Sequence, residues 1–554
     1  MHALLKRIGV TVAATAMASV VLFVLLGALG RDMTPQWRVG PFTDHIAVES
    51  ADTAIRATDL HTPQEGTYQT KETHITVPLA ANVTVNAIVR EPIGAPDGHP
   101  ACLLMHGSGT GKSAEAYGDI ANAMASAGIT TLVPDKRLDN YSALHRDYVS
   151  SAHDYARSLE TLRQWPGVDP AKTGLYAESE GTWIATVLTQ EHQDIAFAIL
   201  TSSPVVSGRQ QMTLAATSYL TTVGAPDAVK GIIPRLTSLS LKSIGLEYAD
   251  FDAAQYRTSL TMPLLINYGV RDSAMPIEQG ARLLMQAANE AGNDNVTLRY
   301  FDANHQMRTG SNATVPGLPL EEHYTHDLED WINAIAAGTT ADGWATPMIA
   351  GAQPNQRIAA PLSTKPALIK TLDVLVGGIA SCLLLALAAI VGALILLIVG
   401  MSRSPQDSRR FAGPLRMALA VNTILAAGMT GIFLAYLFAV VRDAITLTND
   451  STLLARYWQY IVIGAIVSLI AFAWLLVECV FAIRARRRQE SAWPLHAHLA
   501  DTHEDTHDGH RNMAGIRNDH GKAGVGFGHV AVATCVMLSA ALSLALLAFW
   551  GLFG

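Results

Sequence analysis

The sequence of 554 residues predicts a mixed α/β domain with a mostly parallel sheet, joined to a group of apolar α-helices. Three observations predict this two-part architecture. From residue 67 onward, short apolar stretches alternate with helical ones, which is typical of a parallel sheet covered by helices on both faces. Five blocks of 22 to 26 residues contain at most one charged side chain each. Charged residues make up only 16% of the chain, against about 25% in soluble domains.

The predicted strands are short runs rich in β-branched residues. The first two, 73–77 and 83–89, alternate apolar and polar residues as the strands of a half-buried hairpin do. The later runs are mostly apolar, which indicates strands buried on both faces. These later strands are expected at 101–105, 130–133, 173–177, 196–200, 264–268 and 296–301. The helices between the strands are expected at 114–127, 143–164, 182–190, 277–291 and 321–336.

The stretch between the strands 196–200 and 264–268 is too long for a plain connection. Its helical composition predicts a lid at about 203–262, over the carboxyl ends of the strands, where such sheets bind ligands. The sheet domain is therefore assigned to 67–338. The flanking segments are an irregular lead-in at 31–66 and a linker rich in Gly, Pro and Thr at 339–370.

The five apolar blocks are long enough to cross a bilayer as helices, because about 20 apolar residues suffice. The first, within residues 1–30, is predicted to be an anchor, since its 22 apolar residues exceed the usual core of a signal peptide. A signal peptide cleaved near Ala28 remains the alternative. The other four blocks form a transmembrane region at 371–554, with a His-rich cytoplasmic loop at 485–529. The blocks lie at 8–29, 374–399, 417–441, 460–483 and 530–553.

Basic residues predict the orientation of these helices, because cytoplasmic loops carry an excess of Lys and Arg. Lys6 and Arg7 precede the first block, Arg403, Arg409 and Arg410 lie in the loop between the second and third blocks, and four arginines follow the fourth. Alternating spans then place the sheet domain on the extracytoplasmic side of the cell membrane. The sequence therefore predicts a multi-pass membrane protein whose soluble domain faces outward.

Charge and cysteine usage exclude other classes of protein. The formal net charge of −8 gives no basic footprint for nucleic acid. Of the four cysteines, three lie inside apolar blocks and Cys102 lies in a predicted strand, so no disulfide framework is indicated. The partners expected are a small-molecule or lipid substrate and the bilayer itself, with no nucleic acid. The sequence does not specify an oligomeric state.

Three residues that suit nucleophilic catalysis follow predicted strands in the order Ser, Asp, His. Ser179 stands in the run 177–181, Ala-Glu-Ser-Glu-Gly, and opens a helix. Small residues two positions before and after a serine let strand and helix approach at a sharp turn. Asp272 follows the strand 264–268, and His305 follows the strand 296–301. A serine hydroxyl is a weak nucleophile until a base takes its proton, so these residue types belong together chemically.

This order resembles that of the α/β-hydrolase family over about residues 67–338. The resemblance implies that Ser179 attacks an acyl carbon, His305 takes and returns the proton, and Asp272 orients the imidazole. Ala177 departs from the pattern, because the family usually has glycine there. Asp302 is so close to His305 in sequence that it is interpreted as a turn residue.

The run His-Gly-Ser-Gly at 106–109 follows the strand 101–105. The resemblance implies that a backbone N–H of Ser108 or Gly107, together with that of Glu180, binds the developing oxyanion. The same loop imitates a phosphate-binding motif, but His106 stands where that motif needs its first glycine. No cofactor and no catalytic metal are therefore predicted.

Other polar groups are not assigned a catalytic role. Glu178 and Glu180 are expected to be partly solvated residues that tune the pocket. Glu478, in the fourth apolar block, is expected to reach the interface near Arg484. The histidines of 485–529 leave two interpretations open, a solvated loop with weak metal affinity or a regulatory zinc or nickel site. These histidines are His496, His498, His503, His507, His510, His520 and His529.

The sequence thus predicts a membrane-anchored extracytoplasmic serine hydrolase that cleaves a carboxylic ester or thioester through an acyl-enzyme. One alternative keeps the catalytic triad of Ser179, Asp272 and His305 but changes the bond that is cleaved or the acceptor of the acyl group. The protein would then be a serine peptidase or an acyltransferase that acts on cell-envelope lipids. A second alternative is a non-catalytic ligand sensor or scaffold. The triad argues against the sensor, because a binding protein has no need of it.

Overall fold

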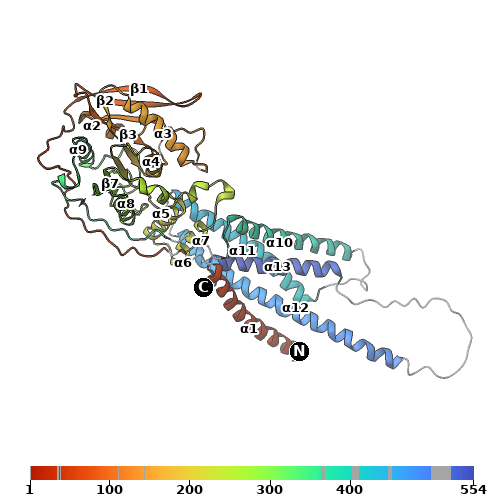
Figure 1. The fold of residues 1–554 in the computed structure, drawn as a ribbon. Coiled ribbons are helices and arrows are strands. Elements are labelled where there is room, and N and C mark those ends of the chain that lie inside the picture. The colour runs from red at the N-terminus through yellow and green to blue at the C-terminus, as the bar shows by residue number, and fades with distance from the viewer. Residues whose placement is uncertain are drawn as a thin grey trace, which may run out of the picture. The chain divides into compact units, whose positions relative to one another are not determined.

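The computed structural model describes residues 2–33, 37, 39–109, 111–142, 144–362, 368–401, 411–446, 452–500 and 526–554 (Figure 1). The chain divides into two compact units. The sheet unit comprises Gln36–Thr222 and Leu236–Lys365, and the helical unit comprises Met1–Pro35, Val223–Arg235 and Pro366–Gly554. The two units are described separately below.

The sheet unit contains a nine-stranded sheet in the order β1-β2-β4-β3-β5-β6-β7-β8-β9. The pairs β1–β2 and β2–β4 are antiparallel, and every later pair is parallel. The predicted α/β class with a mostly parallel sheet is therefore confirmed. The strands are β1 (Gln69–Ala80), β2 (Val83–Ile93), β3 (His99–Met105), β4 (Thr130–Pro134), β5 (Val168–Glu178), β6 (Ala198–Thr201), β7 (Leu264–Gly269), β8 (Val296–Phe301) and β9 (Ile349–Gly351).

Two apolar cores lie on the two faces of this sheet. Alternate residues of β3 point to opposite faces, so Leu103 belongs to one core and Leu104 to the other. The first core is closed by α3 (Tyr148–Arg163), α4 (Glu180–Glu191) and α8 (Gln279–Glu290). The second core is closed by α2 (Gly118–Ser126) and α9 (Tyr324–Ala336). Both faces are covered, which is why the central strands have almost no polar positions.

The helix α3 begins at Tyr148, five residues later than the sequence predicts. Asp147 adopts an extended conformation, and its carboxylate accepts hydrogen bonds from the N–H groups of Val149 and Ser150. Such an N-cap satisfies the first free N–H groups of a helix and fixes its start. The capping aspartate, rather than the apolar periodicity, therefore sets this boundary.

The segment predicted as a lid consists of short helices. Its elements are α5 (Gly208–Thr222), α6 (Asp227–Lys230), α7 (Ile232–Thr237) and three 3₁₀ turns, η1 (Lys242–Ile244), η2 (Glu247–Asp250) and η3 (Ala253–Ser259). Residues 223–235 of this segment belong to the helical unit, and the remainder belongs to the sheet unit.

The two segments that flank the sheet pack against each other and against the sheet edge. The lead-in is irregular, as expected, and forms bridges from Pro41 to Ile358 and from Ser50 to Ala350. The segment predicted as a linker instead supplies β9, which pairs with β8. Arg299 of β8 is fully buried, and its guanidinium donates to the carbonyl oxygens of Thr53 (2.7 Å) and Pro347 (3.1 Å). This buried arginine joins both segments to the sheet.

The helical unit contains five helices long and apolar enough to cross a membrane, among the residues the structure describes. They are α1 (His2–Met33), α10 (Leu372–Met401), α11 (Gly413–Thr446), α12 (Trp458–Ala500) and α13 (Phe527–Phe549), and a π-helical turn, η5 (Thr452–Tyr457), precedes α12. The helix α13 packs on α10, α11 and α1, and α12 packs on α11 and α1. All five correspond to the apolar blocks of the sequence, which supports membrane association.

Two polar residues link helices of this unit. The buried Glu478 of α12 lies 3.6 Å from the guanidinium of Arg7 in α1. The expectation that Glu478 is solvated near Arg484 was therefore wrong, because the partner comes from the far end of the chain. The Asn422 side-chain amide donates to the carbonyl oxygens of Ala418 and Ala471, which joins α11 to α12. Most of the predicted His-rich loop lies outside the described residues.

Candidate active site

Ser179 lies at the sharp turn between β5 and α4. Its backbone has φ 54° and ψ −123°, a conformation that non-glycine residues rarely adopt. Such strain persists only where the surrounding structure enforces it, and it is typical of functional sites. The turn presents Ser179 at the carboxyl end of the sheet, where the sequence predicts the nucleophile.

Close backbone approaches enforce this turn. A Cβ added to Gly181 would lie 2.8 Å from the carbonyl oxygen of Met105 and 2.9 Å from that of His106, so only glycine fits there. A Cβ added to Gly107 would lie 3.3 Å from the Ser179 Cβ. The loop after β3 and the serine turn are therefore in direct contact. This explains why small residues are needed two positions after the serine and in the loop opposite it.

Asp272 and His305 form a close pair in the loops that follow the neighbouring strands β7 and β8. The His305 Nδ1 lies 2.6 Å from the Asp272 Oδ2, while the other carboxylate oxygen accepts from the N–H groups of Ala274 (3.0 Å) and Met275 (3.2 Å). The Asp272 carboxylate is thus fixed at both oxygens. It holds the imidazole with Nδ1–H facing the acid, which leaves Nε2 as the basic nitrogen.

The serine turn and the histidine loop are both attached to the end of β6. The Ser179 N–H donates to the Thr201 carbonyl oxygen (2.9 Å), and the Ser202 hydroxyl donates to the His305 carbonyl oxygen (2.7 Å). Since Thr201 and Ser202 are consecutive residues, the structure brings these parts of the predicted constellation to one edge of the sheet. The catalytic roles assigned to Ser179 and His305 stay predictions.

The predicted oxyanion donors lie around Ser179, and the geometry distinguishes between them. The Gly107 N–H already donates to the Tyr117 hydroxyl at 3.3 Å, whereas Ser108 is exposed on the same loop. Glu180 is the first residue of α4, so its N–H belongs to the free N-terminal donors of that helix. The N–H groups of Ser108 and Glu180 are therefore better candidates for the oxyanion donors than the N–H group of Gly107.

Glu178 lies on one side of Ser179 and is buried, contrary to the expectation of partial solvation. Burial raises the pKa of its carboxyl to about 7, although the nearby His305 and Arg308 oppose this rise. Its only hydrogen bond within the described ranges is a long one from Tyr176 (3.5 Å). The pKa of His305 is itself raised, since Asp272 and Glu178 outweigh the effect of burial. The two groups therefore stabilise each other's charged forms.

Glu180 lies on the other side of Ser179 and is also buried, again contrary to expectation. Its carboxylate accepts a hydrogen bond from the Tyr141 hydroxyl (2.6 Å) and lies 3.4 Å from Arg146 and 3.8 Å from Lys136. Burial lowers the pKa of Lys136 to about 8, although Glu180 opposes this. Sequence analysis missed this cluster, because Lys136, Tyr141 and Arg146 lie in an irregular stretch without a recognisable motif.

The loop after β3 is held by the same cluster. The Lys136 ammonium donates to the Gly107 carbonyl oxygen at 2.6 Å, and the His106 Nε2–H donates to the Pro134 carbonyl oxygen at 2.7 Å. Burial lowers the pKa of His106 to about 4, so this imidazole is neutral and structural. Lys112, the lysine of the phosphate-loop imitation, instead lies 3.5 Å from Asp135.

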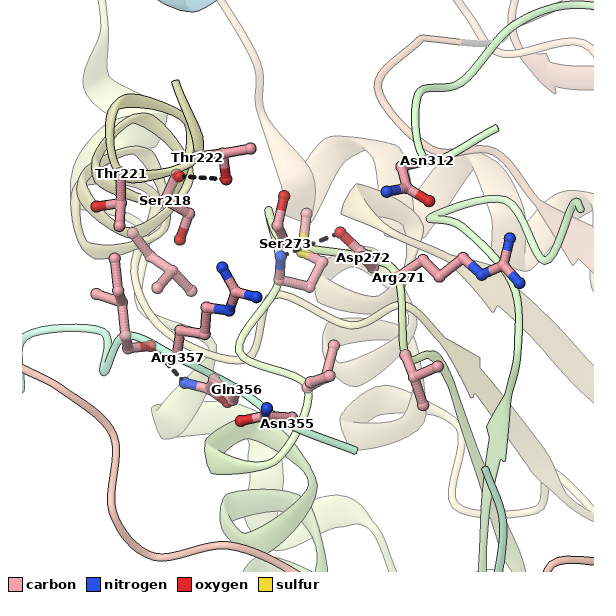
Figure 2. A pocket seen from close by; sticks show the side chains of 15 residues that line it. Ser218, Thr221, Thr222, Arg271, Asp272, Ser273, Asn312, Asn355, Gln356 and Arg357 are labelled. Atoms are coloured by element: carbon pink, nitrogen blue, oxygen red, sulfur yellow. Dashed lines mark hydrogen bonds between the residues drawn. The ribbon is translucent and has the colours of Figure 1, made fainter. Parts of the chain in front are cut away.

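A cavity of about 390 Å³ lies beside Asp272, the acid of the predicted triad (Figure 2). It is lined by α5, by the loop after β7 and by the segment 355–358. Of the three predicted triad residues, Asp272 alone lines it in the part of the chain that the structure describes. Its walls carry many hydroxyl and amide groups and the guanidinium of Arg357.

One group of side chains outside this site has metal-ligand composition. In the described ranges, ligand atoms of Glu65, His326 and Glu329 lie within 4.8 Å of one another. The His326 Nε2 faces Glu65 and its Nδ1 faces Glu329, each at 3.9 Å. Burial raises the pKa of Glu329 to about 9, so that this carboxyl is a neutral acid near pH 7. Different ring nitrogens face the two carboxyls, so this is an imidazole between two acids and not three ligands around one point.

The sheet order, the strained serine turn and the Asp272–His305 pair together define an α/β-hydrolase domain. The protein is a serine hydrolase. Within that class, a family model described as serine aminopeptidase, S33, matches residues 98–240, a stretch that contains the loop after β3 and the Ser179 turn. A comparison with curated protein sequences gave no significant match.

Solved structures with a related fold include hydrolases from different organisms. One is a putative dienelactone hydrolase from Klebsiella pneumoniae subsp. pneumoniae, with 13% identity and a TM-score of 0.35, covering 49% of this chain and 100% of that chain. Another is an esterase from Pyrococcus furiosus, with 16% identity and a TM-score of 0.32, covering 52% of this chain and 97% of that chain.

Proposed function

We propose that this protein is a membrane-anchored, extracytoplasmic hydrolase of carboxylic esters or thioesters, acting through an acyl-enzyme on Ser179. The observation that carries the proposal is the strained Ser179 turn at the same sheet edge as the 2.6 Å pair of Asp272 and His305. A serine at the same edge of the sheet as a base that is itself oriented by an acid has the residue types that nucleophilic catalysis needs.

The reaction follows from these positions. The His305 Nε2 takes the hydroxyl proton as the Ser179 Oγ attacks the acyl carbon, and Asp272 stabilises the imidazolium that forms. The imidazolium then gives its proton to the leaving alcohol or thiol, and the acyl group remains on Ser179. Water, deprotonated by His305, releases the acid in a second addition and elimination. The N–H groups of Ser108 and Glu180 bind the negative oxygen in both steps, and losing one such donor lowers the rate about 100- to 1000-fold.

Labelling of membranes with a fluorophosphonate probe tests the proposed nucleophile. The wild type is expected to be labelled, whereas Ser179→Ala and His305→Ala are not. Ser151→Ala serves as a matched control, because the Ser151 hydroxyl makes a local hydrogen bond, donating to the Asp147 carbonyl oxygen at the start of α3. An unlabelled wild type, or labelling that survives in Ser179→Ala, would show that the proposed nucleophile is wrong.

A serine peptidase is the second candidate, favoured by the description of the matched family as a serine aminopeptidase. Ester and amide substrates with the same acyl group separate the two functions, because amides are cleaved efficiently only when the leaving amine is protonated in place. We expect p-nitrophenyl esters to be cleaved with a much higher kcat/KM than the matching aminoacyl p-nitroanilides. A higher kcat/KM for the anilides would establish the peptidase instead.

The extracytoplasmic location is proposed from the distribution of basic residues in the sequence. Lys6 and Arg7 precede α1, and Arg484 and Arg486 lie near the end of the fourth span. The test is protease protection in sealed vesicles of both orientations. The sheet unit should be cleaved by added protease in right-side-out vesicles and protected in inside-out vesicles. The reverse result would place the hydrolase on the cytoplasmic side.

A further inference from the structure

The cavity beside Asp272 is a built site rather than a gap between loops. Its first wall is α5, its second is the loop after β7, and its third is the extended segment 355–358 (Figure 2). The Gln211 side-chain amide of α5 donates to the Ala274 carbonyl oxygen, and the Gln210 amide donates to the Pro361 carbonyl oxygen (2.6 Å). Side-chain hydrogen bonds therefore tie α5 to both of the other walls.

The third wall is fixed to the domain by buried hydrogen bonds. The Gln356 N–H donates to the Glu278 carboxylate (3.1 Å), and the Gln356 side-chain oxygen accepts from the N–H groups of Glu278 (2.9 Å) and Gln279 (3.0 Å). The next residue, Arg357, accepts at its carbonyl oxygen from the Phe42 N–H (3.0 Å). The backbone that carries Arg357 is thus held on both sides, which preorganises its position.

The charges around the cavity leave one cation in excess. Arg271 is occupied by Asp302, to which it donates through two guanidinium nitrogens. Asp272 is occupied by His305 and by two backbone N–H groups. Arg357 forms no ion pair with any residue in the described ranges, and its side chain is exposed to the cavity. An anionic group would find an uncompensated guanidinium here.

Neutral donors surround that guanidinium. In Figure 2 the Arg357 side chain extends between Ser218 of α5 and Ser273 of the loop after β7, with Asn355 and Asn312 at other points of the wall. Hydroxyl and amide groups together with one arginine suit the oxygens of an anion, since charge-assisted hydrogen bonds are the stronger ones. Apolar side chains, among them Leu214 and Ile277, also line the cavity and suit a short carbon chain.

We infer that this cavity is a substrate subsite for an anionic group, so that the preferred substrates are small esters that carry a negative charge on the acyl or on the leaving-group side. The inference rests on the proposed esterase function. The cavity's volume of about 390 Å³ suits a small polar group, and pockets for small ligands span roughly 300–1,000 Å³.

Matched ester pairs test the inference with the full chain in mild detergent. For the acyl side, the pair is p-nitrophenyl butyrate and the mono-p-nitrophenyl ester of succinic acid. For the leaving-group side, the pair is phenyl acetate and 3-acetoxybenzoate. The wild type should show a higher kcat/KM for the carboxylated member of one pair. Arg357→Gln should reduce that preference by about 10-fold or more, mainly through KM, and leave the neutral esters unchanged.

Two control variants separate recognition from folding. Arg357→Lys keeps a positive charge and should retain part of the preference. Arg56→Gln removes an exposed arginine that pairs with Asp52, outside the cavity, and should change neither substrate pair. No preference for the carboxylated ester in either pair would overturn the inference, as would an equal loss on neutral and charged esters in Arg357→Gln. If the wild type hydrolyses no ester and takes no fluorophosphonate label, the proposed esterase function fails, and this inference fails with it.

Discussion

The two glutamates that flank Ser179 are equally buried but lie in opposite electrostatic surroundings. Glu180 has a tyrosine hydroxyl and two cations within 3.8 Å of its carboxylate. Glu178 has one long hydrogen bond in the described ranges, and burial raises its pKa to about 7. Burial alone favours the neutral form of a carboxyl group, whereas nearby cations favour its charged form. One side of the nucleophile is therefore a carboxylate paired with two cations, and the other is a carboxyl that titrates near neutrality.

The largest effect is expected at the serine between these two glutamates. Ser179→Ala should lower kcat/KM on a p-nitrophenyl ester by about four orders of magnitude or more, because the acyl-enzyme can no longer form. His305→Ala should cause a similar loss, and the double variant should be little worse than either single one. Steady-state kinetics of the three variants check this. Additive losses would show that the two residues do not act as one unit.

The second prediction contrasts the stability effects of the two glutamates. Glu180→Gln leaves Lys136 and Arg146 without their carboxylate, and breaking a buried ion pair costs about 3 kcal/mol. We therefore expect thermal inactivation about 6 to 12 °C lower than in the wild type, for a domain of this size. Glu178→Gln at pH 7 should cost less than about 1 kcal/mol, because no cation in the described part of the chain is paired with this carboxyl and glutamine has nearly the same shape.

Residual esterase activity after heating in mild detergent measures this contrast and follows the sheet unit specifically. Equal stability losses in Glu178→Gln and Glu180→Gln would contradict the difference between their surroundings.

The smallest effect concerns the pH dependence. His305 must be neutral to act as a base, and its pKa is raised by Asp272 and by Glu178. The acid limb of the kcat/KM profile should therefore lie above pH 6.5, the ordinary value for histidine. Removing the Glu178 charge makes the imidazolium less favourable, so Glu178→Gln should move this limb to lower pH. A limb that stays in place, or moves to higher pH, would show that Glu178 does not act on His305.

The strands and the order Ser179, Asp272, His305 could be predicted from the sequence because each depends on a local signal. Apolar runs mark the strands, and the residue that follows each strand must lie at the carboxyl edge of a parallel sheet. The Ser179 turn also has a local signal, since a glycine stands two positions after the serine, as a sharp turn from strand to helix requires. These features need no knowledge of the tertiary structure.

The surroundings of that constellation could not be predicted, because they arise from residues distant in sequence. Lys136 and Arg146 meet Glu180 only after α3 and α4 are packed, and no motif links them. The structure of the segment predicted as a linker also depends on residues distant in sequence. This segment carries β9, which pairs with β8, and Arg357, the arginine of the cavity. Its content of Gly, Pro and Thr suggested a linker, whereas buried hydrogen bonds to Arg299, Glu278 and Gln279 hold it in place.

The most direct test of the account is to trap the acyl-enzyme and locate it. The full chain would be mixed with p-nitrophenyl acetate, quenched in acid during the initial burst, digested and analysed by mass spectrometry. The account predicts one acetylated peptide, modified at Ser179 and absent from the His305→Ala variant. An acetyl group on another residue, or turnover without a modified serine, would contradict it.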